Sequence, residues 1–376
     1  MTRFEWLVAK LHSLVKTHPH DYVLVLSGVG YGDKMRAAAC ARALHLAGYG
    51  KVIFTTTVTG TSIEWSIAAA CPWLAGFVAH QPMPTRGMLA RLLKQWGYVL
   101  DATSMVPILW DRRGRPVASS MPYLGLSLGD PYSRYMLRAL GETQFEAASA
   151  SLGVPVTPDL MPVLDKPPVR PRKDDLPPPL TSIRPENWGK ATPLKIPKGK
   201  KYIVVSFASG MLSAVKSLPQ SCIKVVLDCA KERGVEVVHI GARDVPKLDG
   251  TIDARGLRMD AVVKLMKGAL GVVSVEGFAS YVARSTSCRC LTLMGPTPYP
   301  FFAIEGNVHS MATPGGRLPC PIGTCFWSWA YGLPPDHWGM TCRVALANGK
   351  RTTDCANYVP AAIKDAVSKF LDGDTK

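Results

Sequence analysis

An apolar run in the second half of the chain ends in a carboxylate at the start of a helical pattern. Residues 270–275 are mostly apolar, and Glu276, Gly277, Phe278 and Ser280 follow them. In α/β sheets, ligands bind where strands end and helices begin. There a helix N-terminus offers free N–H groups to a phosphate, and a carboxylate can hold ribose hydroxyls. The pattern predicts a nucleotide or nucleotide-sugar pocket, although an ordinary strand–turn–helix connection with an incidental glutamate has the same pattern.

The first half of the chain has a glycine-rich turn between an apolar run and a helical run, with Gly28, Gly30, Gly32 and Asp33 in it. The third glycine falls one residue early for a dinucleotide fingerprint, and the Gly-Lys-Ser/Thr ending of a P-loop is missing. Gly30 and Gly32 would let the backbone approach a ligand on the acceptor side of a cleft. Asp33 is expected directly before a helix at residues 34–46. It could cap that helix, act as a general base on an acceptor hydroxyl, or do both.

Two further ends of apolar runs in the second half carry polar residues. Ser206 and Ser209 follow one run, and Lys216 precedes the next helical run, so their hydroxyls and ammonium group could clamp a diphosphate. A solvated loop lysine is the alternative for Lys216. Gly241 follows another apolar run, where a base or a ribose could rest. His239 lies within that run and is expected to be a hydrogen-bonded core histidine.

The ten cysteines are scattered along the chain and do not form a small disulfide framework. Cys320, Cys325, Cys342 and Cys355 are the one grouping that suggests zinc. Their first spacing is wider than the usual two-residue ligand knuckle, and no paired knuckle follows. The spacing therefore favours cysteines that bind no metal, with a zinc site as the alternative.

These residues need a scaffold of alternating strands and helices, which the hydrophobic periodicity indicates in both halves. The alternation predicts two doubly wound, Rossmann-like α/β domains that face a cleft. Their expected bounds are 1–154 and 202–376, with a basic, proline-rich linker at 155–201. The last helix, at about 358–371, could pack on either domain. The expected strands are residues 22–27, 51–55, 96–101, 202–207, 235–240, 270–275 and 291–294, and the other expected helices are 4–15, 34–46, 219–233, 259–267 and 278–283.

Length and charge restrict the class of protein. With 376 residues, of which 47% are hydrophobic, the chain can form two large cores. No uncharged apolar run approaches the ~20 residues of a membrane span, and the N-terminus lacks a signal-peptide stretch, so a cytoplasmic location is expected. The net charge of +16, from 44 basic and 28 acidic side chains, favours anionic partners. A solvated basic surface without a specific partner is the alternative.

Taken in order along the chain, the motifs resemble those of glycosyltransferase family 9, the heptosyltransferase-like enzymes with the GT-B fold. Gly32-Asp33 matches the Gly-Asp pair that opens the family's first helix. The run that ends in Asp101 is similar to the family's Asp-ended strand. Lys216 to Pro219 is similar to Lys-x-Trp-Pro, with leucine in place of tryptophan. The segment from Ser274 is similar to Ser-x-Asp-Thr-Gly-x-x-His, and Gly-Pro-Thr follows at residues 295–297.

The resemblance implies an inverting transfer of a sugar from a nucleotide sugar to a hydroxyl group, with Asp33 as the base and without a metal or other cofactor. It implies a diphosphate near Ser209 and Lys216 and a nucleoside near Glu276. The chain also departs from the family pattern. Glu276 replaces an aspartate, Gly277-Phe278 replaces Thr-Gly, and Tyr281 replaces a histidine. Because these changes reshape the site, the family's ADP-heptose donor does not carry over automatically.

Three functions are compatible with the residues. The resemblance favours a phosphorylated saccharide or glycolipid acceptor, the latter reached by peripheral contact with a membrane. The basic charge also suits duplex DNA, so a phage-type glycosyltransferase acting on hydroxymethylated bases is the second function. Exposed aromatic side chains at Trp327, Trp329 and Trp338 would support it. A non-catalytic nucleotide- or nucleic-acid-binding protein is the third, because the departures just named could remove the reaction.

Overall fold

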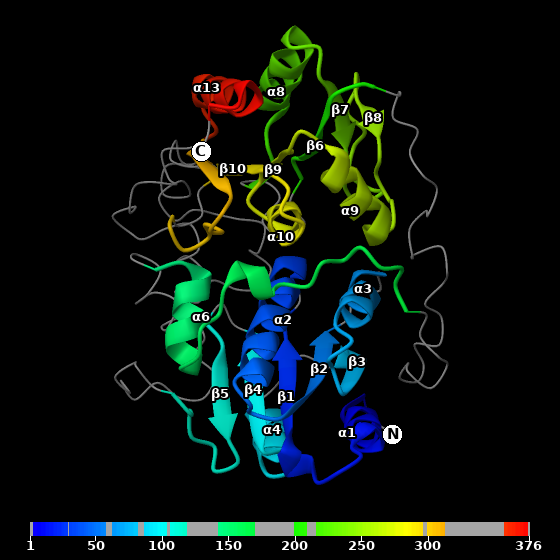
Figure 1. The fold of residues 1–376 in the computed structure, drawn as a ribbon, viewed down its shortest axis with the longest axis vertical. Coiled ribbons are helices and arrows are strands. Elements are labelled where there is room, and N and C mark those ends of the chain that lie inside the picture. The colour runs from blue at the N-terminus through cyan, green and yellow to red at the C-terminus, as the bar shows by residue number, and fades with distance from the viewer. Residues whose placement is uncertain are drawn as a thin grey trace, which may run out of the picture. The chain divides into compact units, whose positions relative to one another are not determined.

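The computed structural model describes residues 3–28, 30–57, 62–81, 86–103, 106–118, 142–169, 199–208, 216–295, 299–312 and 357–374. The chain divides into two compact units, and each contains its own sheet (Figure 1). The described helices include none with the length and apolar character needed to cross a membrane. The first unit comprises Met1–Arg138, Gln144–Lys190 and Arg258–Asp260, and the second comprises Ala139–Thr143, Ala191–Leu257 and Ala261–Lys376.

The first unit is built on a five-stranded sheet with the strand order β3-β2-β1-β4-β5. All six residues of the central strand β1 (Tyr22–Ser27) are buried, as expected for an apolar run covered on both faces of a parallel sheet. β1 pairs in parallel with β2 (Lys51–Thr57) and β4 (Tyr98–Ala102), so the three strands predicted here are confirmed. β3 (Gly76–Gln81) extends the parallel sheet beyond β2. The edge strand β5 (Ile108–Asp111) runs antiparallel to β4.

Helices and two short 3-10 turns surround this sheet. Helix α1 packs against β3, and its side chains Trp6, Leu7 and Leu11 join a core that also contains Trp96. Of the residues expected to begin the linker, Met161 and others are buried within this unit, and the linker bounds stay a prediction. The described helical elements are α1 (Arg3–Leu14), η1 (Pro19–Asp21), α2 (Tyr31–Leu46), α3 (Ser62–Ala70), α4 (Arg86–Leu93), α6 (Gln144–Leu152) and η2 (Pro158–Leu160).

Helix α2 begins three residues earlier than the sequence predicts. Gly30 is its N-cap, and the N–H of Lys34 donates to the carbonyl of Gly30 at 3.0 Å, which closes the first turn. Gly32 and Asp33 therefore lie inside the first turn, and the expectation that Asp33 precedes the helix was wrong. A glycine weakens a helix interior, but the first turn has free N–H groups in any case, so the helix can start through it.

The second unit is built on a six-stranded sheet with the order β11-β10-β9-β6-β7-β8, in which every neighbouring pair is parallel. The predicted strands and helices of this unit are all found, with bounds within two residues of those expected. β8 and β11 were not predicted. The elements are β6 (Tyr202–Ser206), α8 (Gln220–Glu232), β7 (Glu236–His239), β8 (Ile252–Asp253), α9 (Met259–Gly268), β9 (Val272–Val275), α10 (Phe278–Ser285), β10 (Cys290–Met294), β11 (Val308–Met311) and α13 (Pro360–Asp372).

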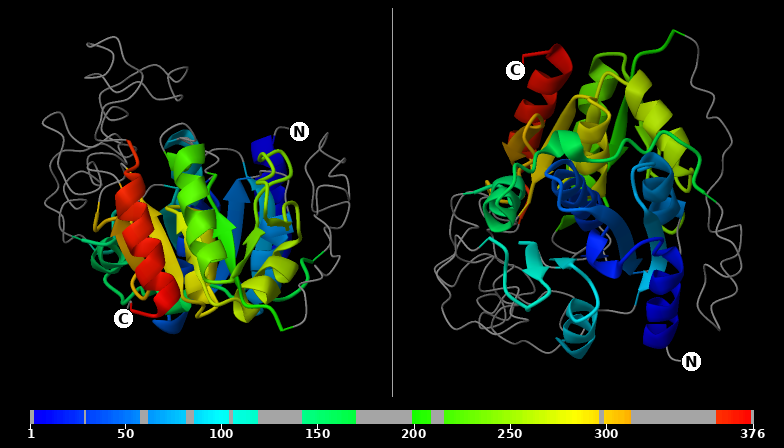
Figure 2. Two further views of the ribbon diagram at one scale, coloured as in Figure 1. Left: turned by 90° about the horizontal axis from the view of Figure 1, so that it is seen from above. Right: turned by 60° about the horizontal axis from the view of Figure 1, so that its bottom comes forward.

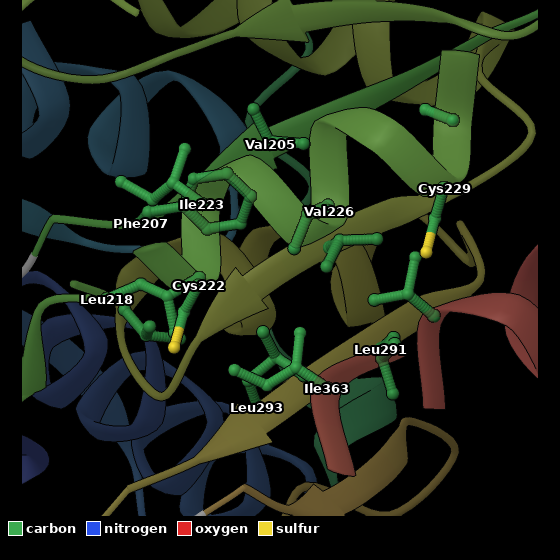
Figure 3. Close-up of a cluster of buried hydrophobic side chains, with 14 of the residues drawn as sticks. Val205, Phe207, Leu218, Cys222, Ile223, Val226, Cys229, Leu291, Leu293 and Ile363 are labelled. Carbon is green, nitrogen blue, oxygen red and sulfur yellow. The ribbon is translucent and has the colours of Figure 1, made fainter. Parts of the chain in front are cut away.

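The core of the second unit lies between one face of its sheet and the helices α8 and α13. Figure 2 shows α13 (red) beside α8 (green), and Figure 3 shows their apolar side chains meeting those of β6 and β10. The guanidinium of Arg233, at the end of α8, pairs with the carboxylate of Asp372, at the end of α13, at 2.7 Å. The last helix thus packs on the second unit, which decides between the two predicted placements. Members of this core include Val205, Ile223, Val226, Leu291, Leu293, Ile363, Val367 and Phe370.

Candidate functional site

Each sheet has one point where the chain changes the side on which it adds strands. In the first sheet, β2 and β3 follow on one side of β1, and β4 and β5 follow on the other. In the second sheet, β7 and β8 follow on one side of β6, and β9, β10 and β11 follow on the other. Ligands of open α/β sheets bind beyond the carboxyl ends of the two strands at such a point. The relevant loops therefore follow β1 and β4 in one unit and β6 and β9 in the other.

Asp33 lies beyond β1, in the first turn of α2. Its side chain is 37% exposed, and its Oδ1 accepts a hydrogen bond from Nη2 of Arg36 at 3.3 Å. A Cβ atom added to Gly30 would lie 2.6 Å from Oδ2, so a side chain at that position would force the carboxylate to move. The predicted residues Gly30 and Asp33 are therefore in contact, and Gly32 occupies the same turn. Oδ1 of Asp33 is thus held by Arg36, whereas Oδ2 lies next to Gly30, which has no side chain.

Buried charges beneath this turn were not found by sequence reasoning. Nζ of Lys34 lies 2.6 Å from Oε1 of Glu64 in α3, and the two side chains are 0% and 2% exposed. Nζ also lies 5.1 Å from the centroid of the Tyr31 ring. Burial lowers the pKa of Lys34, and the nearby Glu64 carboxylate opposes this shift. The sequence signal that could have revealed this pair is Lys34 in the alanine-rich helix α2 and Glu64 in the apolar helix α3.

Arg36 connects the turn with helix α6. It is fully buried, and its Nη1 donates to the side-chain oxygen of Gln144 at 3.2 Å while its Nη2 donates to Asp33. Gln144 is itself buried at the start of α6. The guanidinium is thus held between a neutral amide and the carboxylate of Asp33. More than a hundred residues separate Arg36 from Gln144, so no local pattern reveals their contact.

In the second unit the structure brings together two residues that the sequence indicated separately. Lys216, just before α8, and Glu276, just after β9, form an ion pair of 2.6 Å with side chains 12% and 8% exposed. Their loops are those of the switch point between β6 and β9. Nζ of Lys216 also lies 5.3 Å from the centroid of the Phe302 ring. The pair can present a cation to a diphosphate and a carboxylate to hydroxyl groups.

Tyr358 fixes the backbone at this pair. Its hydroxyl donates to the carbonyl oxygen of Lys216 at 2.7 Å. Burial, and next the negative charge of Glu276, raise the pKa of Tyr358, so the phenol stays protonated and remains a donor. Sequence reasoning missed both Phe302 and Tyr358, which lie far along the chain from Lys216.

The other predicted residues of this pocket have different surroundings. Gly277 is the N-cap of α10, and a Cβ atom added there would meet no described atom within 4 Å, so the space above it is open. Phe278 is half-buried as the first residue of α10. The hydroxyl of Ser280 donates to the carbonyl of Gly277 at 2.6 Å and so stabilises the turn. Ser206 ends β6 beside β9, whereas Ser209 lies outside the described residues.

Gly241 and His239 lie one strand further along the sheet, at the end of β7. The carbonyl of Gly241 accepts from the N–H of Gly256 at 2.8 Å. His239 is buried, as predicted, but its Nδ1 has no hydrogen-bond partner among the described residues, so the prediction of a hydrogen-bonded core histidine was wrong. Its sheet partners at the same level are Val205 and Asp253. Burial lowers the pKa of His239, which keeps the imidazole neutral.

Metal ligands do not cluster in the part of the chain that the structure describes, where no three His, Cys, Asp or Glu side chains lie close enough to share an ion. Cys320, Cys325, Cys342 and Cys355 lie outside the described residues, as do Trp327, Trp329 and Trp338. The zinc alternative and the exposure of these tryptophans are therefore still predictions.

No known family and no curated protein matches the amino-acid sequence. Solved structures do match the fold. The iron-containing dodecameric glycosyltransferase TibC from enterotoxigenic E. coli is 14% identical over 96% of this chain and 78% of that chain, with a TM-score of 0.54. A structure of TibC in complex with ADP-D-β-D-heptose has a TM-score of 0.55 at the same identity and coverage.

The glycosyl transferase family 9 protein from Veillonella parvula is 11% identical, covers 96% of this chain and 99% of that chain, and has a TM-score of 0.50. These matches extend over both sheets. The resemblance expected from the motifs is thus confirmed at the level of the fold, and the chain has the GT-B fold of the heptosyltransferase-like glycosyltransferases.

Proposed function

We propose that this protein is an inverting glycosyltransferase that moves a sugar from a nucleotide sugar to a hydroxyl group of an anionic acceptor. The observation that carries the proposal is the Lys216–Glu276 pair at the switch point of the second sheet. It sets a cation and a carboxylate beside the open N-terminus of α10, as a sugar diphosphate requires. The fold shared with TibC, which was solved with ADP-D-β-D-heptose, supports a donor of this class.

The donor in this proposal binds through its diphosphate and its nucleoside. Lys216 exchanges Glu276 for the phosphate oxygens, and the first backbone N–H groups of α10 take part of the same charge. Glu276 is then free to accept from hydroxyl groups of the ribose or of the sugar. Ser206, Ser209, Gly241, Phe278 and Ser280 complete the proposed pocket, with Phe278 as an apolar wall.

The reaction in this proposal is a single displacement. Oδ2 of Asp33 takes the proton of the acceptor hydroxyl as its oxygen forms a bond to the anomeric carbon. The bond from that carbon to the diphosphate oxygen breaks, and the nucleoside diphosphate leaves with the electron pair. Lys216 and the N–H groups after Gly277 stabilise the developing negative charge, so the scheme needs no metal. Attack opposite the leaving group inverts the anomeric centre.

The proposed acceptor carries phosphate groups, as a phosphorylated saccharide or glycolipid does. The support is the net charge of +16, which attracts anions over the whole protein. The same charge would suit duplex DNA. Transfer to a phosphorylated saccharide that persists at a salt concentration abolishing DNA binding supports the saccharide. If transfer occurs only to hydroxymethylated DNA and falls steeply with salt, the acceptor is DNA and the saccharide proposal is wrong.

A thermal-shift series with nucleoside diphosphates and their sugars, in EDTA, tests the donor site. A ligand at a hundred times its Kd stabilises the protein by about 2.7 kcal/mol, and we expect one nucleotide to do so. The double variant Lys216→Met/Glu276→Gln removes the cation without leaving a buried lone carboxylate, and should lose the shift. Lys224→Met, at an exposed lysine of α8, is the matched control and should keep it. Equal shifts in both variants, or none in the native protein, would contradict the donor site.

A further inference from the structure

We propose that Arg36 and Gly30 set the position of the Asp33 carboxylate: Arg36 anchors Oδ1, and Gly30 leaves the space in which Oδ2 takes the proton. Neither residue touches the substrate in this scheme, so both are positioning residues. The inference rests on the proposed role of Asp33 as the general base. It concerns contacts within the first unit alone.

Two buried cations lie near the start of α2. Lys34 and Arg36 lie in the first two turns of α2, where the helix dipole favours negative charge. Burying a cation there is unfavourable unless an anion is held close to it. Lys34 has Glu64 at 2.6 Å, and Arg36 has Asp33 at 3.3 Å. Arg36 therefore occupies a position where a buried cation is unfavourable, next to the carboxylate that the proposed reaction uses.

The guanidinium of Arg36 is held in a fixed orientation. Its planar fork presents donors in fixed directions. Because Nη1 is held by the buried side chain of Gln144, the direction of Nη2 toward Asp33 is set as well. An arginine on a solvated face could not do this, since its side chain would be free to turn. The contact from α6 thus reaches Asp33 through Arg36.

Gly30 leaves room for the Asp33 carboxylate. Gly30 has φ −67° and ψ 141°, an extended conformation that any residue adopts, so conformational freedom does not explain it. Lack of space explains the glycine, because a Cβ added to it would lie 2.6 Å from Oδ2 of Asp33. The obstructed atom is the end of a side chain. An alanine would therefore move the carboxylate and leave the backbone in place.

Gly30→Ala is the first test. We expect thermal stability close to that of the native protein, an unchanged KM for the donor, and a kcat at least tenfold lower, because the carboxylate is displaced from the reacting hydroxyl. Gly87→Ala is the matched control, since a Cβ at this exposed glycine of α4 meets no described atom within 4 Å. A Gly30→Ala protein with native kcat would overturn the proposal.

A double-mutant cycle with Arg36→Gln and Asp33→Asn is the second test. We expect Arg36→Gln to lower kcat at least tenfold when Asp33 is present, and to cause no further loss when Asp33→Asn is already in place. Arg36→Lys should recover part of the loss, and Arg42→Gln, on the same helix over the Trp73 ring, should cause none. The donor-induced thermal shift reports on the second unit and should persist in every variant.

Losses of kcat that multiply in the double variant would show that Arg36 acts independently of Asp33 and would overturn the proposal. Native turnover in Asp33→Asn has a different meaning, because it removes Asp33 as the base and so contradicts the proposed function itself. If Arg36→Gln does not fold, Gly30→Ala decides alone.

Discussion

Lys34 and Glu64 place two opposite charges in the interior of the first unit, with side chains 0% and 2% exposed. Such a pair adds little net stability, but removing one partner leaves the other charge buried without its counter-charge. We expect Lys34→Met to lower the free energy of unfolding by about 3–5 kcal/mol. The double variant Lys34→Met/Glu64→Leu should recover most of that loss, and urea denaturation measures both. If the double variant is as unstable as the single one, the pair stabilises the fold in some other way.

His309 makes the stability of the second unit depend on pH. Burial lowers its pKa from the usual 6.5 to about 4, and its Nε2 accepts from the N–H of Ile304 at 3.0 Å, which requires the neutral ring. Between those two pH values the unfolded chain binds the extra proton, so the free energy of unfolding falls as pH falls from about 6.5 to about 4. Buried His239 has a shift of the same sign.

The variant His309→Gln tests this dependence, because glutamine can still accept from the N–H of Ile304 but does not titrate. Urea denaturation at pH 7 and at pH 4.5 should show a smaller difference for His309→Gln than for the native protein. His20→Gln, at an exposed histidine, should leave the difference unchanged. An unaltered pH dependence in His309→Gln would show that other groups cause it.

At the scale of the elements, strands buried on both faces were the most predictable, because continuous apolar runs such as residues 22–27 have few other places in a fold. β3 and β5 were missed for different reasons. β3 starts at Gly76, a poor strand residue, where an added Cβ would lie 2.8 Å from a side-chain carbon of Leu14 and would force it to move. β5 is four residues long and pairs antiparallel to β4, which no pattern of alternating strands and helices indicates.

Helix α13 contributes Ile363, Val367 and the aromatic ring of Phe370 to the second core. Phe370 is buried, and a Cβ added to Gly271 would lie 2.4 Å from its Cζ, so the ring fills the space left by that glycine. We expect Phe370→Ala to lower the free energy of unfolding by about 3–5 kcal/mol. Arg233→Ala breaks the exposed ion pair between the ends of α8 and α13 and should cost under about 1 kcal/mol. Similar losses in the two variants would contradict this ranking.

At the scale of the whole molecule, the sequence located candidate site residues in each unit but not their supports. Asp33, Lys216 and Glu276 were predicted because each lies beside a recognisable apolar or helical run in the sequence. Gln144 and Tyr358 were not found, because they reach the site from distant parts of the chain through packing that only the tertiary structure creates. Contacts of this kind carry no local signal, so sequence patterns indicate candidate ligand-binding groups better than the groups that hold them in place.

In the proposed donor site, the ion pair between Lys216 and Glu276 would also affect which anions can bind. Because the lysine already has a carboxylate at 2.6 Å, an incoming anion has to displace an internal competitor before it gains the cation. Free orthophosphate brings few contacts with which to do so, whereas a large ligand can compensate through its other groups. Glu276 would thus lower the affinity of the proposed site for small inorganic ions.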